Sequence, residues 1–206
     1  MAAEQIANFS VKPTLTGMKV LLRPFVAEDI QHLLAALRDP EAALLTGSAH
    51  SDGDLARWDA ASEERARQWY NTRNQQTDRL DLAVVDRAHG ECVGEVVLNE
   101  WNEENRSCNF RTVLGPTGRN RGLGTEATRL IVRYGFEQLG LHRISLEVYS
   151  FNPRARRAYD KVGFVAEGVL RHVLRYNDDW IDATVMSILA HEWANHGGRP
   201  LFSGSS

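Results

Sequence analysis

Cysteine, long apolar runs and net charge are all scarce in this chain of 206 residues. Its two cysteines, Cys92 and Cys108, match no metal-ligand spacing and form no Cys-x-x-Cys motif, so we expect two reduced, buried thiols. No apolar run approaches the roughly 18 residues that a membrane-spanning helix needs. The formal net charge of −3 argues against a general binder of nucleic acids or anionic membranes.

What is present is an ordinary globular composition, with 43% hydrophobic and 25% charged residues, which excludes a disordered, collagen-like or coiled-coil chain. The start, Met1–Lys12, lacks the basic and apolar blocks of a secretory signal, so we expect a cytoplasmic protein. The length suits one domain. We expect that domain over residues 18–196, after an N-terminal extension (1–17) and before a flexible Gly/Ser-rich tail (197–206).

The order of the predicted elements indicates the fold class. Three strands between residues 80 and 114 are joined by short turns and should form an antiparallel meander, and a β-α-β-α-β stretch follows. The sequence therefore predicts an α/β (α+β) fold with a mixed sheet. The expected strands are 19–25, 80–86, 92–99, 108–114, 143–149, 164–169, 172–176 and 180–189; the expected helices are 30–37, 62–74, 122–138, 153–162 and a piece from 190, with 46–58 as a loop.

A Gly- and Arg-rich segment, Arg119–Thr125, opens one of these helices. Gly122 and Gly124 allow close approach of a ligand to the backbone, and the first N–H groups of a helix are unpaired and carry partial positive charge. With the charges of Arg119 and Arg121, this pattern favours a phosphate or pyrophosphate site. A solvated glycine-rich loop is the alternative.

The same glycines also fit the dinucleotide fingerprint G-x-G-x-x-G/A, as Gly122-x-Gly124-x-x-Ala127, with Glu147 about 20 residues further on. Two details weigh against an NAD-binding enzyme. Seven residues separate Leu114, at the end of the strand, from the first glycine, and an antiparallel meander comes before it.

A second segment, Asn152–Phe164, begins with Asn as N-cap and Pro at the first helical position. Helical spacing places Ala155, Ala158 and Tyr159 on one side. The small alanines leave room for a neighbouring chain or a ligand, beside which the Tyr159 hydroxyl would lie. A tyrosine packed in the core is the alternative.

These two segments, in this order and one strand apart, resemble the GNAT superfamily of acyl-CoA-dependent N-acyltransferases. Further likeness in Leu21–Pro24, Gly124–Ala127, Leu141–Ile144 and Glu192-Trp193 is similar to the RimJ/RimL branch, which acetylates protein N-termini and includes relatives acting on small amines. The resemblance covers about Met18–Trp193. It implies a GNAT-type, mostly antiparallel sheet with a central, splayed parallel pair flanked by helices, and a possible homodimer.

The resemblance implies acetyl-CoA, or another acyl-CoA, as co-substrate. It would place the pyrophosphate on the loop, chiefly on backbone N–H groups, the pantetheine along the end of the preceding strand and on Asn152, and the 3′-phosphate near Arg154 or Arg157. The implied binding residues are Val113, Leu114, Arg119, Arg121, Gly122, Leu123, Gly124, Thr125, Asn152 and Arg157.

The implied reaction is direct acyl transfer to a primary amine, of a small molecule or a polypeptide N-terminus, through a tetrahedral intermediate. Tyr159 matches the position of the family's general acid, which protonates the leaving thiolate. Asn152 is expected to be the second residue of the catalytic site. The chain departs from the pattern at Asn109, where relatives often carry a Glu base. A water relay remains open, as do four carboxylates: Glu95, Glu100, Glu147 and Asp182.

The missing acid leaves a second hypothesis, a non-catalytic acyl-CoA sensor or interaction module. The acceptor site is expected between segment 46–58, the helix with Trp69 and Tyr70, and the turn 177–182. No metal is expected, because His191 and His196 are five apart and point in different directions on a helix.

Overall fold

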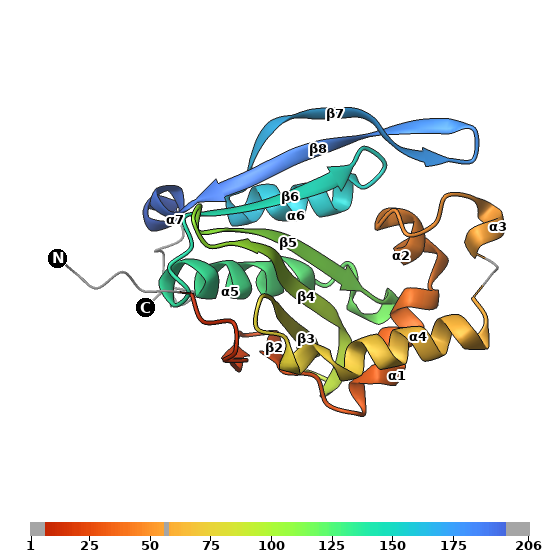
Figure 1. The fold of residues 1–206 in the computed structure, drawn as a ribbon, viewed down its shortest axis with the longest axis horizontal. Helices are drawn as coiled ribbons and strands as arrows, with labels where there is room; N and C mark the ends of the chain where they lie inside the picture. Colours follow the sequence, from red (N-terminus) through yellow and green to blue (C-terminus); the bar gives the residue numbers. More distant parts are fainter. Residues whose placement is uncertain (1–6, 56–57, 197–206) are drawn as a thin grey trace.

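The computed structural model of the chain describes residues 7–55 and 58–196. Its described strands form one sheet in the order β1-β2-β3-β4-β5-β6-β8-β7 (Figure 1). Every neighbouring pair is antiparallel except β5 and β6, which confirms the predicted mixed sheet with one parallel pair. The strands are β1 Leu15–Thr16, β2 Val20–Arg23, β3 Leu80–Asp86, β4 Glu91–Asn102, β5 Ser107–Leu114, β6 Arg143–Tyr149, β7 Val165–Tyr176 and β8 Asp179–Leu189.

Helices cover both faces of the sheet (Figure 1). In β3, Leu82 and Val84 pack in one core with α5, while Ala83 and Val85 pack in a second core with α1 and α4. Alternate side chains of a strand point to opposite faces, so β3 is buried along its whole length. The helices are α1 Asp29–Arg38, α2 Pro40–Leu45, α3 Asp52–Leu55, α4 Ala60–Asn71, α5 Leu123–Glu137, α6 Pro153–Val162 and α7 Ala190–His196.

The parallel strands β5 and β6 pair over a short stretch only. Their register ends at the pair formed by Asn109 and Ser145, after two earlier pairs. Beyond that point β5 continues to Leu114 and β6 to Tyr149 without facing each other, and Figure 1 shows the two strands diverging. This parting opens the middle of the sheet and leaves one edge of β5 without a neighbouring strand.

Two sequence predictions are corrected. Segment 46–58 was expected to be a loop, but it contains the short helix α3, and α2 precedes it. Asp39-Pro40 ends α1 as predicted, yet Asp39 also caps α2 by accepting a hydrogen bond from the Ala42 N–H, with Pro40 at the first helical position. The separate strands at 164–169 and 172–176 form the single strand β7, in which bulges break the alternation of side chains that the sequence prediction relied on.

Residues 7–17, expected as part of an extension, contact the rest of the chain. Phe9 is only 2% exposed and its ring lies 5.3 Å from that of Trp101. Strand β1 pairs with β2. The predicted tail, 197–206, lies outside the described residues.

Candidate active site

A cleft of about 590 Å³ lies where β5 and β6 part. Two sets of residues line it. We call the first the helical wall; it comprises the lining residues of 118–128 and 152–161, which come from the start of α5, from α6 and from the loops before the two helices. We call the second the strand wall. It comprises Glu100, Asn109, Arg111, Glu147 and Tyr149, from β4, β5 and β6; Thr46, the C-cap of α2, lines the cleft beside it.

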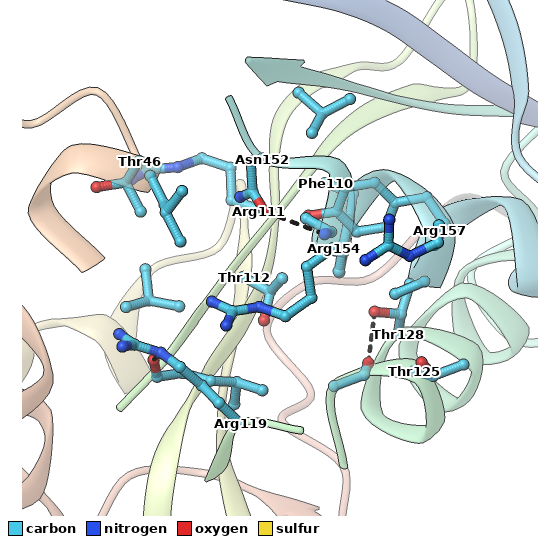
Figure 2. Close-up of a pocket in the computed structure, with 18 of the residues that line it drawn as sticks. Thr46, Phe110, Arg111, Thr112, Arg119, Thr125, Thr128, Asn152, Arg154 and Arg157 are labelled. Carbon is cyan, nitrogen blue, oxygen red and sulfur yellow. Dashed lines mark hydrogen bonds between the residues drawn. The ribbon is translucent and has the colours of Figure 1, made fainter. Parts of the chain in front are cut away.

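Figure 2 shows Thr46 toward one end of the cleft and Thr125, Thr128 and Arg157 toward the other. Side chains from different elements of the fold therefore face the same space. The N-termini of two helices, α5 and α6, also meet at this cleft, because Gly122 and Asn152 are their N-caps and both line it.

Two glycines shape the start of α5. Gly122 has φ of +80°, a left-handed conformation that favours glycine. A β-carbon on Gly124 would lie 2.9 Å from Cδ1 of Leu114, so a side chain there would displace the Leu114 side chain at the end of β5. The first helical hydrogen bond runs from the Glu126 N–H to the Gly122 carbonyl. The N–H groups of residues 123–125 precede it, and they are the donors that a phosphate at a helix start accepts from.

Asn152 and Tyr159 are positioned by α6. The Asn152 side-chain oxygen accepts a hydrogen bond from the Ala155 N–H at 3.0 Å, drawn dashed in Figure 2, which leaves its NH₂ group for the cleft. Tyr159 is 8% exposed and packs edge-on against Phe110 with ring centres 6.0 Å apart. Burial raises the pKa of Tyr159 to about 12, so the phenol keeps its proton at neutral pH.

The loop arginines do not present their charges as the sequence predicted. Arg119 lines the cleft, but its guanidinium donates to the Leu114 carbonyl at 2.9 Å, to Glu41 at 2.6 Å and to Asp39. Arg121 does not line the cleft. It pairs with Asp86 at 2.6 Å and borders a separate hollow. The charge of each is therefore largely neutralised by carboxylates of the fold.

The remaining predicted binding residues divide clearly. Val113, Leu114, Gly122, Gly124, Thr125, Asn152 and Arg157 line the cleft, whereas the Leu123 side chain is buried in the core beside α5. Arg154 lines the cleft but pairs with Glu41 at 2.8 Å. Arg157 is exposed, and no hydrogen bond or ion pair holds it among the described residues. It is thus the better of the two candidates for a phosphate contact.

The strand wall lies on the sheet face opposite α5. Cys108, Phe110 and Ile144 point into the core beside α5, so Asn109, on the same strand as the first two, points to the other face. The Asn109 NH₂ group donates to the Asn99 side-chain oxygen at 3.2 Å. This neutral amide pair stands where a carboxylate base was expected.

Of the four candidate carboxylates, Glu100 and Glu147 line the cleft and the other two do not. Glu95 is 5% exposed and lies on β4, on the same sheet face as Arg111, where burial and nearby Asp81 raise its pKa to about 7. Its Oε2 has no hydrogen-bond partner among residues 7–55 and 58–196. Asp182 accepts a hydrogen bond from the His172 N–H at 2.8 Å, away from the cleft.

The expected acceptor segments are partly placed at the cleft. Trp69 and Tyr70 do not line it. They pack in the second core, between the sheet and α1, where Tyr70 contacts Phe25. The tip of the β7–β8 hairpin is fixed to the segment before α3, since the Asn177 N–H donates to the His50 carbonyl (Figure 1). Sequence reasoning missed the lining residues Ala42, Leu45, Arg111 and Thr128. Strand alternation from Asn109 would have found Arg111.

No group of three or more His, Cys, Asp or Glu side chains suited to a metal ion occurs within residues 7–55 and 58–196. Within the same ranges, no helix combines the length and the apolar character needed to cross a bilayer.

Comparison with known proteins adds to this geometry. Residues 19–165 match the family model described as acetyltransferase (GNAT) domain. Over 116 residues the chain is 34% identical to spermidine N(1)-acetyltransferase of Escherichia coli K12, covering 56% of this chain and 62% of that protein. It is 33% identical over 112 residues to the Vibrio cholerae enzyme of the same name, covering 54% and 65%. The chain thus matches less than two thirds of the length of these relatives.

Solved structures show the same fold. The crystal structure of spermidine N-acetyltransferase from Vibrio cholerae in complex with CoA and spermine aligns with a TM-score of 0.73 at 24% identity, covering 87% of this chain and 100% of that one. An acetyltransferase of the GNAT family from Bacillus anthracis aligns with a TM-score of 0.72 at 21% identity, covering 87% and 99%. The family model spans well over half of the sequence, and the parted β5–β6 pair agrees with it: the chain belongs to the GNAT acetyltransferase family.

Proposed function

We propose that the protein is an acetyl-CoA-dependent N-acetyltransferase that acts on a primary amine. The observation that carries this is the cleft between parted parallel strands. One wall holds the N–H groups of 123–125, which have no hydrogen-bond partner within the described part of the chain, and buried Tyr159 lies near the point where the strands part. Gly124 supports it, because a residue without a β-carbon lets the start of α5 pack closely against the Leu114 side chain, and both residues line the cleft.

The helical wall would bind the cofactor. Its backbone N–H groups would take the pyrophosphate, and Arg157 the 3′-phosphate. The NH₂ group of Asn152 would donate to a pantetheine carbonyl, and the backbone of Val113 and Leu114, at the unpaired edge of β5, would pair with the pantetheine arm as a strand would. A backbone N–H at this edge would also polarise the thioester carbonyl.

In the reaction, the neutral amine nitrogen forms a bond to the thioester carbonyl carbon and the C–S bond breaks. Tyr159 donates its phenolic proton to the departing sulfur. The amine loses its proton to Glu100 or Glu147, directly or through water, since these carboxylates line the strand wall and Asn109 has no basic group. Both substrates thus meet where the two walls converge.

We place the chain in the RimJ/RimL-like branch, on the motifs around Arg23-Pro24 and Glu192-Trp193. Its acceptor is then a small-molecule amine or a polypeptide N-terminus. The relatives named for spermidine support a small-molecule amine. The catalytic domain comprises residues 18–196, with 7–17 packed on it, and works in the cytoplasm.

We also propose a homodimer through β7. This strand ends the sheet, pairs only with β8 among the described strands, and exposes Val165, Val169 and Val173, each more than two fifths exposed. An unprotected edge with apolar side chains favours pairing with another chain. Sedimentation should give a dimer that Val169→Lys dissociates; a monomeric wild type would contradict the proposal.

The experiment for the activity is a thiol-release assay with acetyl-CoA and a panel of primary amines and peptides, beside calorimetric titrations of acetyl-CoA and NAD. We expect acetyl-CoA binding, thiol release and acetylated amine in equal amounts. The acyl-CoA sensor, favoured by the Asn99–Asn109 amide pair, predicts binding without thiol release. Binding of NAD but not acetyl-CoA would contradict both.

A further inference from the structure

Two opposite charges face the cleft from corresponding positions on the parted strands. Asn109 and Ser145 form the last registered pair of β5 and β6. The next residue on the same face is Arg111 on β5 and Glu147 on β6, because side chains alternate along a strand. Both line the cleft and both are exposed. The sheet itself thus sets one positive and one negative group on either side of the gap.

No direct contact within the described residues holds either side chain, although the charge of Arg111 lowers the pKa of buried Glu95 and opposes its rise. Among the described residues, Arg111 and Glu147 take part in no hydrogen bond or ion pair, whereas two other arginines that line the cleft do. Arg119 and Arg154, for comparison, are both held by Glu41. An arginine left without a partner in a substrate cleft is available to a ligand.

Tyr149 shows that both charges act on one small region. Its pKa is raised by burial and by Glu147, while Arg111 opposes the rise. A β-carbon on Gly47 would lie 2.6 Å from the Tyr149 hydroxyl, so the segment after α2 closes this end of the cleft. The two charges therefore share a bounded space around one phenol.

We infer that the acceptor is a small amine that carries a carboxylate close to its amino group, with Arg111 binding the carboxylate and Glu147 the ammonium. The inference rests on the proposed function and names the class of its substrate. A guanidinium matches a carboxylate with two parallel hydrogen bonds. A polyamine would instead place a second positive charge beside Arg111, which is unfavourable. Arg111 is thus a specificity-determining residue that disfavours spermidine-like acceptors.

The test uses two acceptors that differ by one group. L-Lysine is cadaverine with one added carboxylate, and spermidine serves as a longer polyamine. With the wild type we expect kcat/KM for lysine at least about tenfold above that for cadaverine, since a charged hydrogen-bonded pair contributes roughly 1.5–3 kcal/mol.

Variants assign the preference to one side chain. Arg111→Gln should lower kcat/KM for lysine about tenfold through KM, with kcat and the KM for acetyl-CoA unchanged. Arg111→Glu should reverse the preference, so that cadaverine and spermidine become the better acceptors. The matched control is Arg133→Gln, on the exposed side of α5 and paired with exposed Glu137, which should change neither ratio.

Equal use of lysine and cadaverine by the wild type, or a ratio that Arg111→Gln leaves unchanged, would overturn the inference while the acetyltransferase activity stands. Absence of thiol release with every amine would instead count against the proposed function. In that case the dissociation constants of lysine and cadaverine, titrated into the CoA-saturated protein, still decide the inference by the same ratio.

Discussion

The helical wall and the strand wall of the cleft bind with different kinds of atoms. The helical wall offers backbone N–H groups at the start of α5 and the N-cap side chain of α6, held in place by Gly122, Gly124 and Asn152. The strand wall offers charged side chains, Arg111 and Glu147, on a regular backbone. Backbone donors suit a ligand that stays the same, whereas strand side chains can change by single substitutions without moving the sheet.

This difference predicts that substitutions in the two walls affect different constants. Those in the helical wall should alter acetyl-CoA binding, and those in the strand wall should alter acceptor binding. Tyr159 belongs to the helical wall but should act on the chemical step.

The largest expected effect is that of Tyr159→Phe. Removal of the acid should lower kcat about 100-fold, or about 3 kcal/mol, with acetyl-CoA affinity unchanged. The control is Tyr134→Phe, a half-buried tyrosine of α5 that does not line the cleft. Because the pKa of Tyr159 is raised to about 12, its ionisation should give no loss of kcat at any pH up to about 10. An unchanged kcat in saturating assays would exclude Tyr159 as the acid.

The next largest effect is expected on stability, from the loss of the Arg119 side chain. Arg119 is 8% exposed and ties the end of β5 to Asp39 and Glu41 of the α2 region. Arg119→Gln removes the ion pairs to Asp39 and Glu41 and leaves Glu41 only its pair with Arg154 among the described residues, so it should lower the free energy of unfolding by about 2–3 kcal/mol. Urea titration measures it. Exposed Arg157→Gln is the control and should cost less than about 0.5 kcal/mol; equal losses would contradict the assigned role of Arg119.

Glu95, which is buried on β4, should make the free energy of unfolding fall as pH rises. Its pKa is about 7 in the folded chain and near 4.5 unfolded. The folded chain therefore binds more protons between these values, so the contribution is present below pH 4.5 and lost as pH rises through 7. Glu95→Gln should stabilise the protein at pH 8 by about 2 kcal/mol and change little at pH 4. Exposed Glu91→Gln serves as control in urea titrations; stabilisation at both pH values would contradict the cause.

A smaller effect separates backbone strain from binding. Gly122 and Gly90 have similar left-handed φ angles of +80° and +74°, but only Gly122 lies at the cleft. Alanine at either position should cost about 1 kcal/mol of stability. Only Gly122→Ala should also weaken acetyl-CoA binding, about tenfold, because the helix start must shift. Equal acetyl-CoA affinities of the two variants in calorimetry would break the link between loop geometry and binding.

The helical wall could be predicted from sequence because its signals are local. Glycines at a helix start and Asn-Pro at a helix cap act through neighbouring residues. Gly122, Gly124, Asn152 and Tyr159 all line the cleft, and their roles there stay predictions. The neutralised charge of Arg119 could not be predicted, since its partners Asp39 and Glu41 are about 80 residues away in the chain.

The strand wall could be predicted only in part. Its strands were found, because alternating apolar residues mark them, but the facing of Arg111 and Glu147 depends on the parallel register and on where it ends. Helix α2 was missed because Asp39-Pro40 ends α1 and also begins α2. In β7, bulges between Ala166 and Gly168 and between Leu170 and Leu174 joined what looked like two strands.

The most direct test of the division between the walls is one set of steady-state KM values for both substrates, measured for Arg157→Gln and Arg111→Gln. We predict that Arg157→Gln raises the KM for acetyl-CoA about fivefold, as expected for an exposed charge contact, and leaves the acceptor KM unchanged. Arg111→Gln should raise the KM for the acceptor, lysine, and leave the KM for acetyl-CoA unchanged. If either variant raises both KM values equally, or neither variant raises any, the account of two separate walls is contradicted.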